Sequence, residues 1–125
     1  MRPKNPTTAL RARTLVTQAL CVLGLAGMSL GVLDPSEGSG GILAGTCLAT
    51  LGAIVGRSRF RRLMYWSLVL VVIGVAGMWV TSAMGGFGGD TGRSDWWALI
   101  LVPYAAGTII GIVGAARASL EALMR

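Results

Sequence analysis

The polar side chains within the long apolar stretches of this chain are the first place to look for chemistry. No Asp, Glu, Lys, Arg or His occurs in any of these stretches. Their polar residues include Thr17, Gln18, Thr46, Thr50, Ser67, Thr81, Ser82, Tyr104 and Thr108. A hydroxyl can bond to a carbonyl of the preceding helical turn, whereas the Gln18 amide cannot do so as easily and should face protein. Because proton-driven transport needs a titrating group in the membrane, these residues do not predict it.

Patterns for catalysis and metal binding are also missing from the sequence. The chain has no histidine, and its two cysteines, Cys21 and Cys47, both fall within apolar stretches. We interpret them as small apolar residues at helix contacts, and a pair at similar depth is the alternative. No nucleophile stands beside a base, and the glycines of residues 85–89 follow no strand, so they make no nucleotide-binding loop. We therefore expect no enzyme activity and no cofactor or metal.

Pro103 and Tyr104 are the most specific pair of residues in the apolar stretches. Proline removes one backbone hydrogen bond from a helix and tends to kink it, and a buried tyrosine hydroxyl needs a hydrogen-bond partner. We favour a structural kink at this point. A lipid, a quinone or another ligand bound at the kink is the alternative.

The composition predicts a membrane protein. The 125 residues are 54% hydrophobic and 13% charged, with a mean hydropathy of +0.69, whereas a soluble domain has about 25% charged residues. The predicted spans are residues 14–33, 40–56, 63–84 and 96–116. A helix of about 20 residues is about 30 Å long, which matches the hydrocarbon core of a bilayer. Each span must be helical because lipid offers no partner for free backbone groups.

The basic residues lie on one side of these spans. Ten of the eleven precede the first span, separate the second from the third, or follow the fourth: Arg2, Lys4, Arg11, Arg13, Arg57, Arg59, Arg61, Arg62, Arg117 and Arg125. The opposite connections hold Arg93 and four of the five acids. This bias predicts both termini in the cytoplasm. The topology determinants are Arg57, Arg59, Arg61 and Arg62. Since no basic face is interleaved with aromatic residues, the charge does not indicate nucleic-acid binding.

The spans define one predicted domain with two cytoplasmic extensions. These are a leader of residues 1–13, the transmembrane domain of residues 14–116, and a helical tail of residues 117–125. In the tail, Arg117, Glu121 and Arg125 recur at a spacing of four, on one helix face. A cleaved signal peptide is the alternative for the first span, but that span exceeds the about 7–15 residues of a signal-peptide core.

The two halves of the chain resemble each other. Residues 23–28 match residues 73–78 at an offset of fifty, and residues 50–56 match residues 108–114 at an offset of fifty-eight. Matched spans have the same orientation, so a duplication would produce two tandem hairpins related by an axis along the membrane normal. Order and topology favour duplication. Chance similarity among sequences rich in Gly, Ala, Leu and Val is the alternative.

Small residues form stripes along the predicted spans. Helices in lipid associate mainly where small residues let their backbones approach closely. The helix-packing candidates are Gly27, Gly31, Gly41, Gly45, Ala49, Ala53, Gly107, Gly111 and Ala115. We expect these stripes to pack the chain against itself, and contact with another subunit is the alternative.

The absence of chemistry, the small-residue stripes and the short loops together favour a non-catalytic accessory or structural subunit. It would pack within a larger membrane complex or against further copies of itself, surrounded by the lipid bilayer. A small oligomeric transporter, channel or holin-like pore protein is the alternative, although the hydroxyls are scattered rather than gathered on one face. Ten arginines against one lysine are typical of a GC-rich bacterial genome, so we expect the bacterial plasma (inner) membrane.

Overall fold

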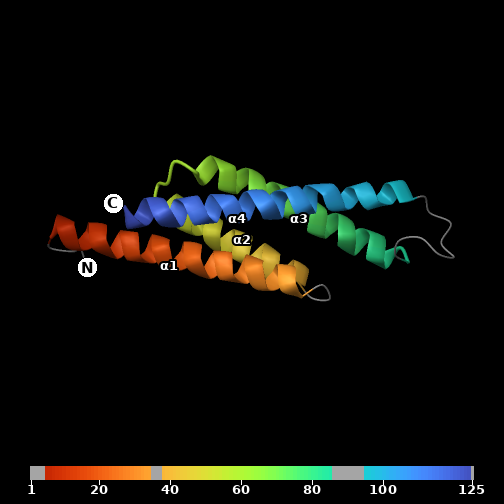
Figure 1. The fold of residues 1–125 in the computed structure, drawn as a ribbon, viewed down its shortest axis with the longest axis horizontal. Helices are drawn as coiled ribbons and strands as arrows, with labels where there is room; N and C mark the ends of the chain where they lie inside the picture. Colours follow the sequence, from red (N-terminus) through yellow and green to blue (C-terminus); the bar gives the residue numbers. More distant parts are fainter. Residues whose placement is uncertain (1–4, 35–37, 86–94, 125) are drawn as a thin grey trace.

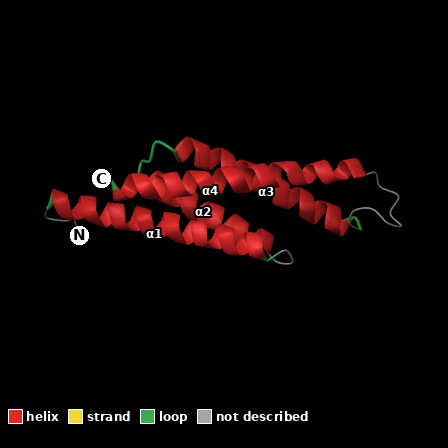
Figure 2. Ribbon diagram, viewed as in Figure 1, coloured by secondary structure: helices red, strands yellow, loops and turns green. Residues whose placement is uncertain are grey.

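The chain folds into a bundle of helices. The computed structural model describes residues 5–34, 38–85 and 95–124, and nearly all of these residues are helical (Figure 2). The helices are α1 (Pro6–Leu33), α2 (Gly38–Val55), α3 (Arg61–Ala83), the 3-10 helix η2 (Asp95–Ile100) and α4 (Leu101–Leu123). Helices α1, α2 and α3 and the segment Ala98–Leu123 are each long and apolar enough to cross a membrane. The protein is therefore an all-helical, multi-pass membrane protein.

Both ends of the chain lie at the same end of the bundle, which we call the termini end (Figure 1). Here the helices run past the predicted spans. Helix α1 begins at Pro6, inside the predicted leader, because proline suits the first turn of a helix and residues 9–13 include good helix formers. Helix α4 continues to Leu123 without a break after the predicted span. Polar side chains of α1 and α4 therefore reach the termini end on rigid helices.

The helix type changes just before Pro103, where the sequence predicts a kink. Pro103 is the third residue of α4, directly after η2. In a continuous α-helix its nitrogen would bond to the carbonyl of Leu99, which belongs to η2. A proline cannot make that bond, so the change from 3-10 to α geometry falls where the bond is missing.

Two clusters of buried side chains fill the space between the helices. The first draws on all four α-helices and contains Met28, Ala49, Ala53, Met64 and Ala115. The second contains Ile42, Val71 and Val75, with Leu43 and Tyr104 packed against it. Buried hydroxyls within the bundle donate to backbone carbonyls, as in Thr46 to Ile42, Thr50 to Thr46, Ser67 to Gly107, Thr81 to Gly77 and Thr108 to Tyr104.

The predicted small-residue stripes lie where helices meet. A Cβ added to Gly45 of α2 would lie 2.6 Å from the carbonyl oxygen of Gly24 and 2.6 Å from the nitrogen of Met28, both in α1. A Cβ added to Gly107 of α4 would lie 2.8 Å from the nitrogen of Val71 in α3. Such distances are too short for any Cβ, so these positions require glycine for backbone-to-backbone packing.

Candidate functional site at the termini end

The turn after α2 positions Ser58, a central residue of the site. The amide of Ser58 donates to the carbonyl of Ala53 (2.9 Å), and the amide of Arg57 donates to the carbonyl of Ile54 (3.0 Å). These two bonds make a Schellman motif, in which the first residue beyond the helix is usually glycine because its backbone is left-handed. Here that residue is Arg57, with φ of 48°. The turn reverses the chain and points the Ser58 side chain back toward the bundle.

Ser58 joins three segments through its short side chain. It is buried, and its hydroxyl donates to Oε2 of Glu121 in α4 at 2.6 Å. The Ser58 Oγ also accepts a hydrogen bond from the amide of Phe60 at 3.2 Å, just before α3 begins. A hydrogen bond to a charged carboxylate is stronger than one between neutral groups, about 1.5–3 kcal/mol. Ser58 therefore ties the turn between α2 and α3 to the C-terminal part of α4.

Arg13 makes the matching connection from α1. Its Nε–H donates to the carbonyl oxygen of Val55, the last residue of α2, at 2.7 Å. Carbonyls in the last turn of a helix have no partner within the helix, and a cation there is favoured by the helix dipole. Arg13 thus caps α2 and fixes the angle at which α1 leaves the bundle.

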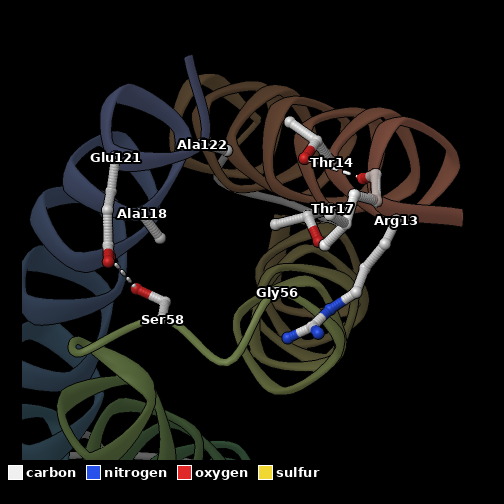
Figure 3. A pocket seen from close by; sticks show the side chains of 9 residues that line it. Arg13, Thr14, Thr17, Gly56, Ser58, Ala118, Glu121 and Ala122 are labelled. Atoms are coloured by element: carbon white, nitrogen blue, oxygen red, sulfur yellow. Dashed lines mark hydrogen bonds between the residues drawn. The ribbon is translucent and has the colours of Figure 1, made fainter. Parts of the chain in front are cut away.

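These segments enclose a pocket of about 180 Å³, which we call the termini-end pocket (Figure 3). Its walls are formed by Leu10, Arg13, Thr14, Thr17, Gly56, Ser58, Ala118, Glu121 and Ala122. Figure 3 shows Glu121 and Ser58 on one side of this pocket and Arg13 on the other. The pocket therefore combines one cationic side chain, one carboxylate and three hydroxyls with an apolar floor of alanines.

Thr17 is the unusual residue in this wall. Its side chain is only 3% exposed, and its hydroxyl oxygen has no hydrogen-bond partner. A Cβ added to Gly56 would lie 2.9 Å from that oxygen, so Gly56 leaves it room. An unpaired buried hydroxyl costs about 1–3 kcal/mol. Thr14, one turn earlier, donates to the carbonyl of Leu10 at 3.1 Å. Thr14 therefore has a hydrogen-bond partner for its hydroxyl, whereas Thr17 does not.

The predicted helix-packing residues occupy the interior, away from this pocket. Seven are buried, while Gly27 and Gly41 are partly exposed between α1 and α2. Cys21 is buried with its thiol 3.9 Å from the carbonyl of Ala49, and both cysteines are free.

Tyr104 is partly buried, and the structure places it against Gly74 of α3. A Cβ added to Gly74 would lie 2.7 Å from the Cα of Tyr104 and 2.8 Å from its nitrogen. At this position Tyr104 also packs on the second buried cluster. The Pro103–Tyr104 pair thus lies at a contact between α3 and α4, in a different part of the bundle from the termini-end pocket.

The four arginines predicted to set topology surround the turn after α2. Arg57, Arg61 and Arg62 are exposed. Arg59 lies over the ring of Phe60 at 5.9 Å, and Arg117 of α4 lies over the same ring at the same distance. Such cation–π contacts contribute about 0.5–1 kcal/mol at exposed sites. They hold the turn next to α4, close to the Ser58–Glu121 hydrogen bond.

Sequence reasoning did not select the residues of the termini-end pocket as a site. One signal was available: Glu121 is the only acid on the basic side of the chain. Among the described residues, no group of three His, Cys, Asp or Glu could hold a metal ion. The arrangement can bind a small polar group through opposite charges and hydroxyls. Comparison of the chain with protein-family models, curated proteins and solved structures finds no match in any of the three.

Proposed function

We propose that this protein is a non-catalytic accessory or structural subunit of a complex in the bacterial plasma membrane. The observation that carries this proposal is the chemistry of the bundle interior. Buried hydroxyls of Thr46, Thr50, Ser67 and Thr108 donate to backbone carbonyls. A transport path would need polar groups that are available to a solute, whereas these groups already have partners. Such an interior suits a structural subunit, which provides a stable surface for other subunits to pack against.

We further propose that the chain consists of two tandem hairpins that arose by duplication. Thr50 and Thr108 correspond at the offset of fifty-eight, and each donates to the carbonyl four residues earlier. Gly24 and Gly74 correspond at the offset of fifty, and each lies against the backbone of the next helix. Matched residues with matched contacts support a common origin for the two halves.

The proposed orientation places the termini end in the cytoplasm, supported by the ten basic residues on that side of the spans. Thiol labelling of intact cells tests it, in a background where Cys21 and Cys47 are replaced by alanine. We expect a membrane-impermeant reagent to label Glu37→Cys and Gly92→Cys, and to label Arg59→Cys only after lysis. The reverse pattern would overturn the orientation.

The subunit role is tested by crosslinking from exposed helix faces. Val22, Leu51, Val72 and Ile109 are 48%, 52%, 46% and 64% exposed, one on each α-helix. A photoreactive amino acid at each position in the native membrane should give a distinct adduct with a larger protein from at least one face. Position 64, where Met64 is fully buried, is the matched control and should give none.

Two outcomes would contradict this role. Adducts of twice the chain's own mass, together with ion flux in liposomes that contain the pure protein, would indicate the oligomeric pore instead. Lipid adducts alone from all four faces would indicate a protein that works as a single chain.

A further inference from the structure

The termini-end pocket lies beside the point where α1 changes from charged to apolar residues. Arg13 is the last charged residue before the long apolar part of α1, and Thr14 and Thr17 follow it. A second hollow on α1 adjoins the pocket, shares Leu10 and Thr14 with it, and is otherwise lined by Arg11 and Leu15. Leu10 and Leu15 are 62% and 65% exposed, which offers an apolar track beside a polar pocket.

The pocket separates two opposite charges. Arg13 and Glu121 stand on different sides of it (Figure 3), where Arg13 donates to Val55 and Glu121 accepts from Ser58 as one of its contacts. A guanidinium has five N–H donors, of which the Nε–H binds Val55, and a carboxylate has about four acceptor positions. Each group can therefore bind a ligand in addition to its contacts within the protein.

The wall between these charges contains the unpaired hydroxyl of Thr17, which is 3% exposed. Buried polar groups in proteins are almost always paired, and an exception calls for a ligand or a water. A hydroxyl can donate to a phosphate oxygen after rotation of the side chain.

We propose that the termini-end pocket binds the headgroup of an aminophospholipid, with the phosphate on the side of Arg13 and Thr17 and the primary ammonium on the side of Glu121. One acyl chain then follows Leu15 along α1, away from Arg13 and toward the apolar part of the helix. A phosphate alone would place its negative charge near the Glu121 carboxylate, so the pocket discriminates against purely anionic headgroups. A trimethylated ammonium has no N–H to donate to the carboxylate, so phosphatidylcholine should also bind less well.

Native mass spectrometry of the full-length protein in mild detergent tests this proposal. Phosphatidylethanolamine, phosphatidylglycerol and phosphatidylcholine with identical acyl chains are added separately at equal concentration. Because a charge-assisted hydrogen bond distinguishes the first lipid, we expect about tenfold tighter binding of one phosphatidylethanolamine. Water-soluble phosphoethanolamine, which lacks acyl chains, should fail to compete at the same concentration. Equal binding of the three lipids, or effective competition by the soluble compound, would overturn the assignment to an aminophospholipid.

Two variants locate the site. Glu121→Gln should reduce the preference for phosphatidylethanolamine over phosphatidylglycerol by about tenfold, since the ammonium loses its charged acceptor. Arg13→Gln should weaken both lipids, because both carry the phosphate. Arg62→Gln removes an equivalent exposed charge outside the pocket and should change neither. If Glu121→Gln is folded by circular dichroism and binds the lipids as the natural protein does, the bound lipid lies elsewhere and the proposal fails.

Discussion

Thr17 in the α1–α2 pair and Ser67 in the α3–α4 pair correspond at the offset of fifty residues, yet their hydroxyls differ. Both side chains are buried. Ser67 donates to the carbonyl of Gly107 across the α3–α4 contact at 2.7 Å. The carbonyl that corresponds to Gly107 in the first pair is that of Ala49, which faces the thiol of Cys21 at 3.9 Å, and the Thr17 hydroxyl has no partner. In the proposed duplication, this position therefore carries a hydrogen bond between helices in one half and an unpaired hydroxyl in the other.

The contact between α1 and α2 depends most strongly on glycine, and this gives the largest predicted effect. Gly45→Leu would place a Cβ 2.6 Å from backbone atoms of Gly24 and Met28, so the two helices would have to separate. We expect destabilisation of about 3 kcal/mol, at the upper end of the range for overpacking. Unfolding in mixed micelles of mild detergent and SDS, followed by circular dichroism, measures it.

The matched control for this change lies in the same helix. A Cβ added to Gly40 has no neighbour within 4 Å. Gly40→Leu should therefore leave stability unchanged or raise it by up to about 1 kcal/mol, because glycine is a poor helix residue. Equal losses from Gly40→Leu and Gly45→Leu would show that leucine disturbs α2 by some route other than helix contact.

The two corresponding hydroxyls should respond to removal with opposite signs. Ser67→Ala loses the bond to Gly107 and should destabilise the protein by about 0.6 kcal/mol, the average for such bonds in membranes. Thr17→Val replaces an unpaired hydroxyl by a methyl group of similar shape and should stabilise the lipid-free protein by about 1 kcal/mol. The same unfolding measurement compares them. Destabilisation by both changes would mean that Thr17 has a partner in the detergent-solubilised protein.

The Ser58–Glu121 bond ties the turn between α2 and α3 to α4 and should show energetic coupling. A double-mutant cycle with Ser58→Ala and Glu121→Gln isolates the interaction between the two side chains. We expect a coupling of about 1 kcal/mol in the unfolding free energy, since the 2.6 Å bond involves a charged acceptor but lies at the end of the bundle. Ser82→Ala with Glu121→Gln is the control cycle and should give additive effects, because Ser82 is exposed near the last residue of α3 and does not contact the turn.

Much of the fold could be predicted from composition and charge, and the reason is physical. Lipid enforces helices, so four uncharged stretches were enough to predict the four candidate spans. The helical tail was predicted from the spacing of its charged residues, and α4 continues to Leu123. The start of α1 was harder to predict, because residues 6–13 are helical outside the apolar stretch. There helix propensity and contacts at the termini end decide the structure, and hydropathy carries no information about either.

The pocket could not be predicted from the sequence for a related reason. Its walls come from α1, the turn after α2, and α4, which are far apart along the chain. Ser58 lies between two arginines, and in the sequence this segment looks like a basic loop that only sets the membrane topology. The direction of the Ser58 side chain follows from the left-handed conformation of Arg57. A glycine would have signalled such a turn in the sequence, but this position holds arginine. The small-residue stripes could be predicted because their residues are only a few positions apart in the sequence. The residues of the pocket come together only when segments far apart in the sequence pack against each other.

The turn at Arg57 gives another small predicted effect, at a left-handed position that holds arginine instead of glycine. A residue with a side chain at φ of 48° is strained by about 1–2 kcal/mol relative to glycine. Arg57→Gly should therefore stabilise the protein by up to about 1 kcal/mol, since part of the gain is offset by the greater freedom of glycine in the unfolded chain. Arg57→Ala keeps the strain and removes the same charge, so it separates the backbone effect from the electrostatic one. If the unfolding free energies of the glycine and alanine variants are equal, the left-handed backbone at this turn does not limit stability, and the position of Ser58 is set by its bond to Glu121 instead.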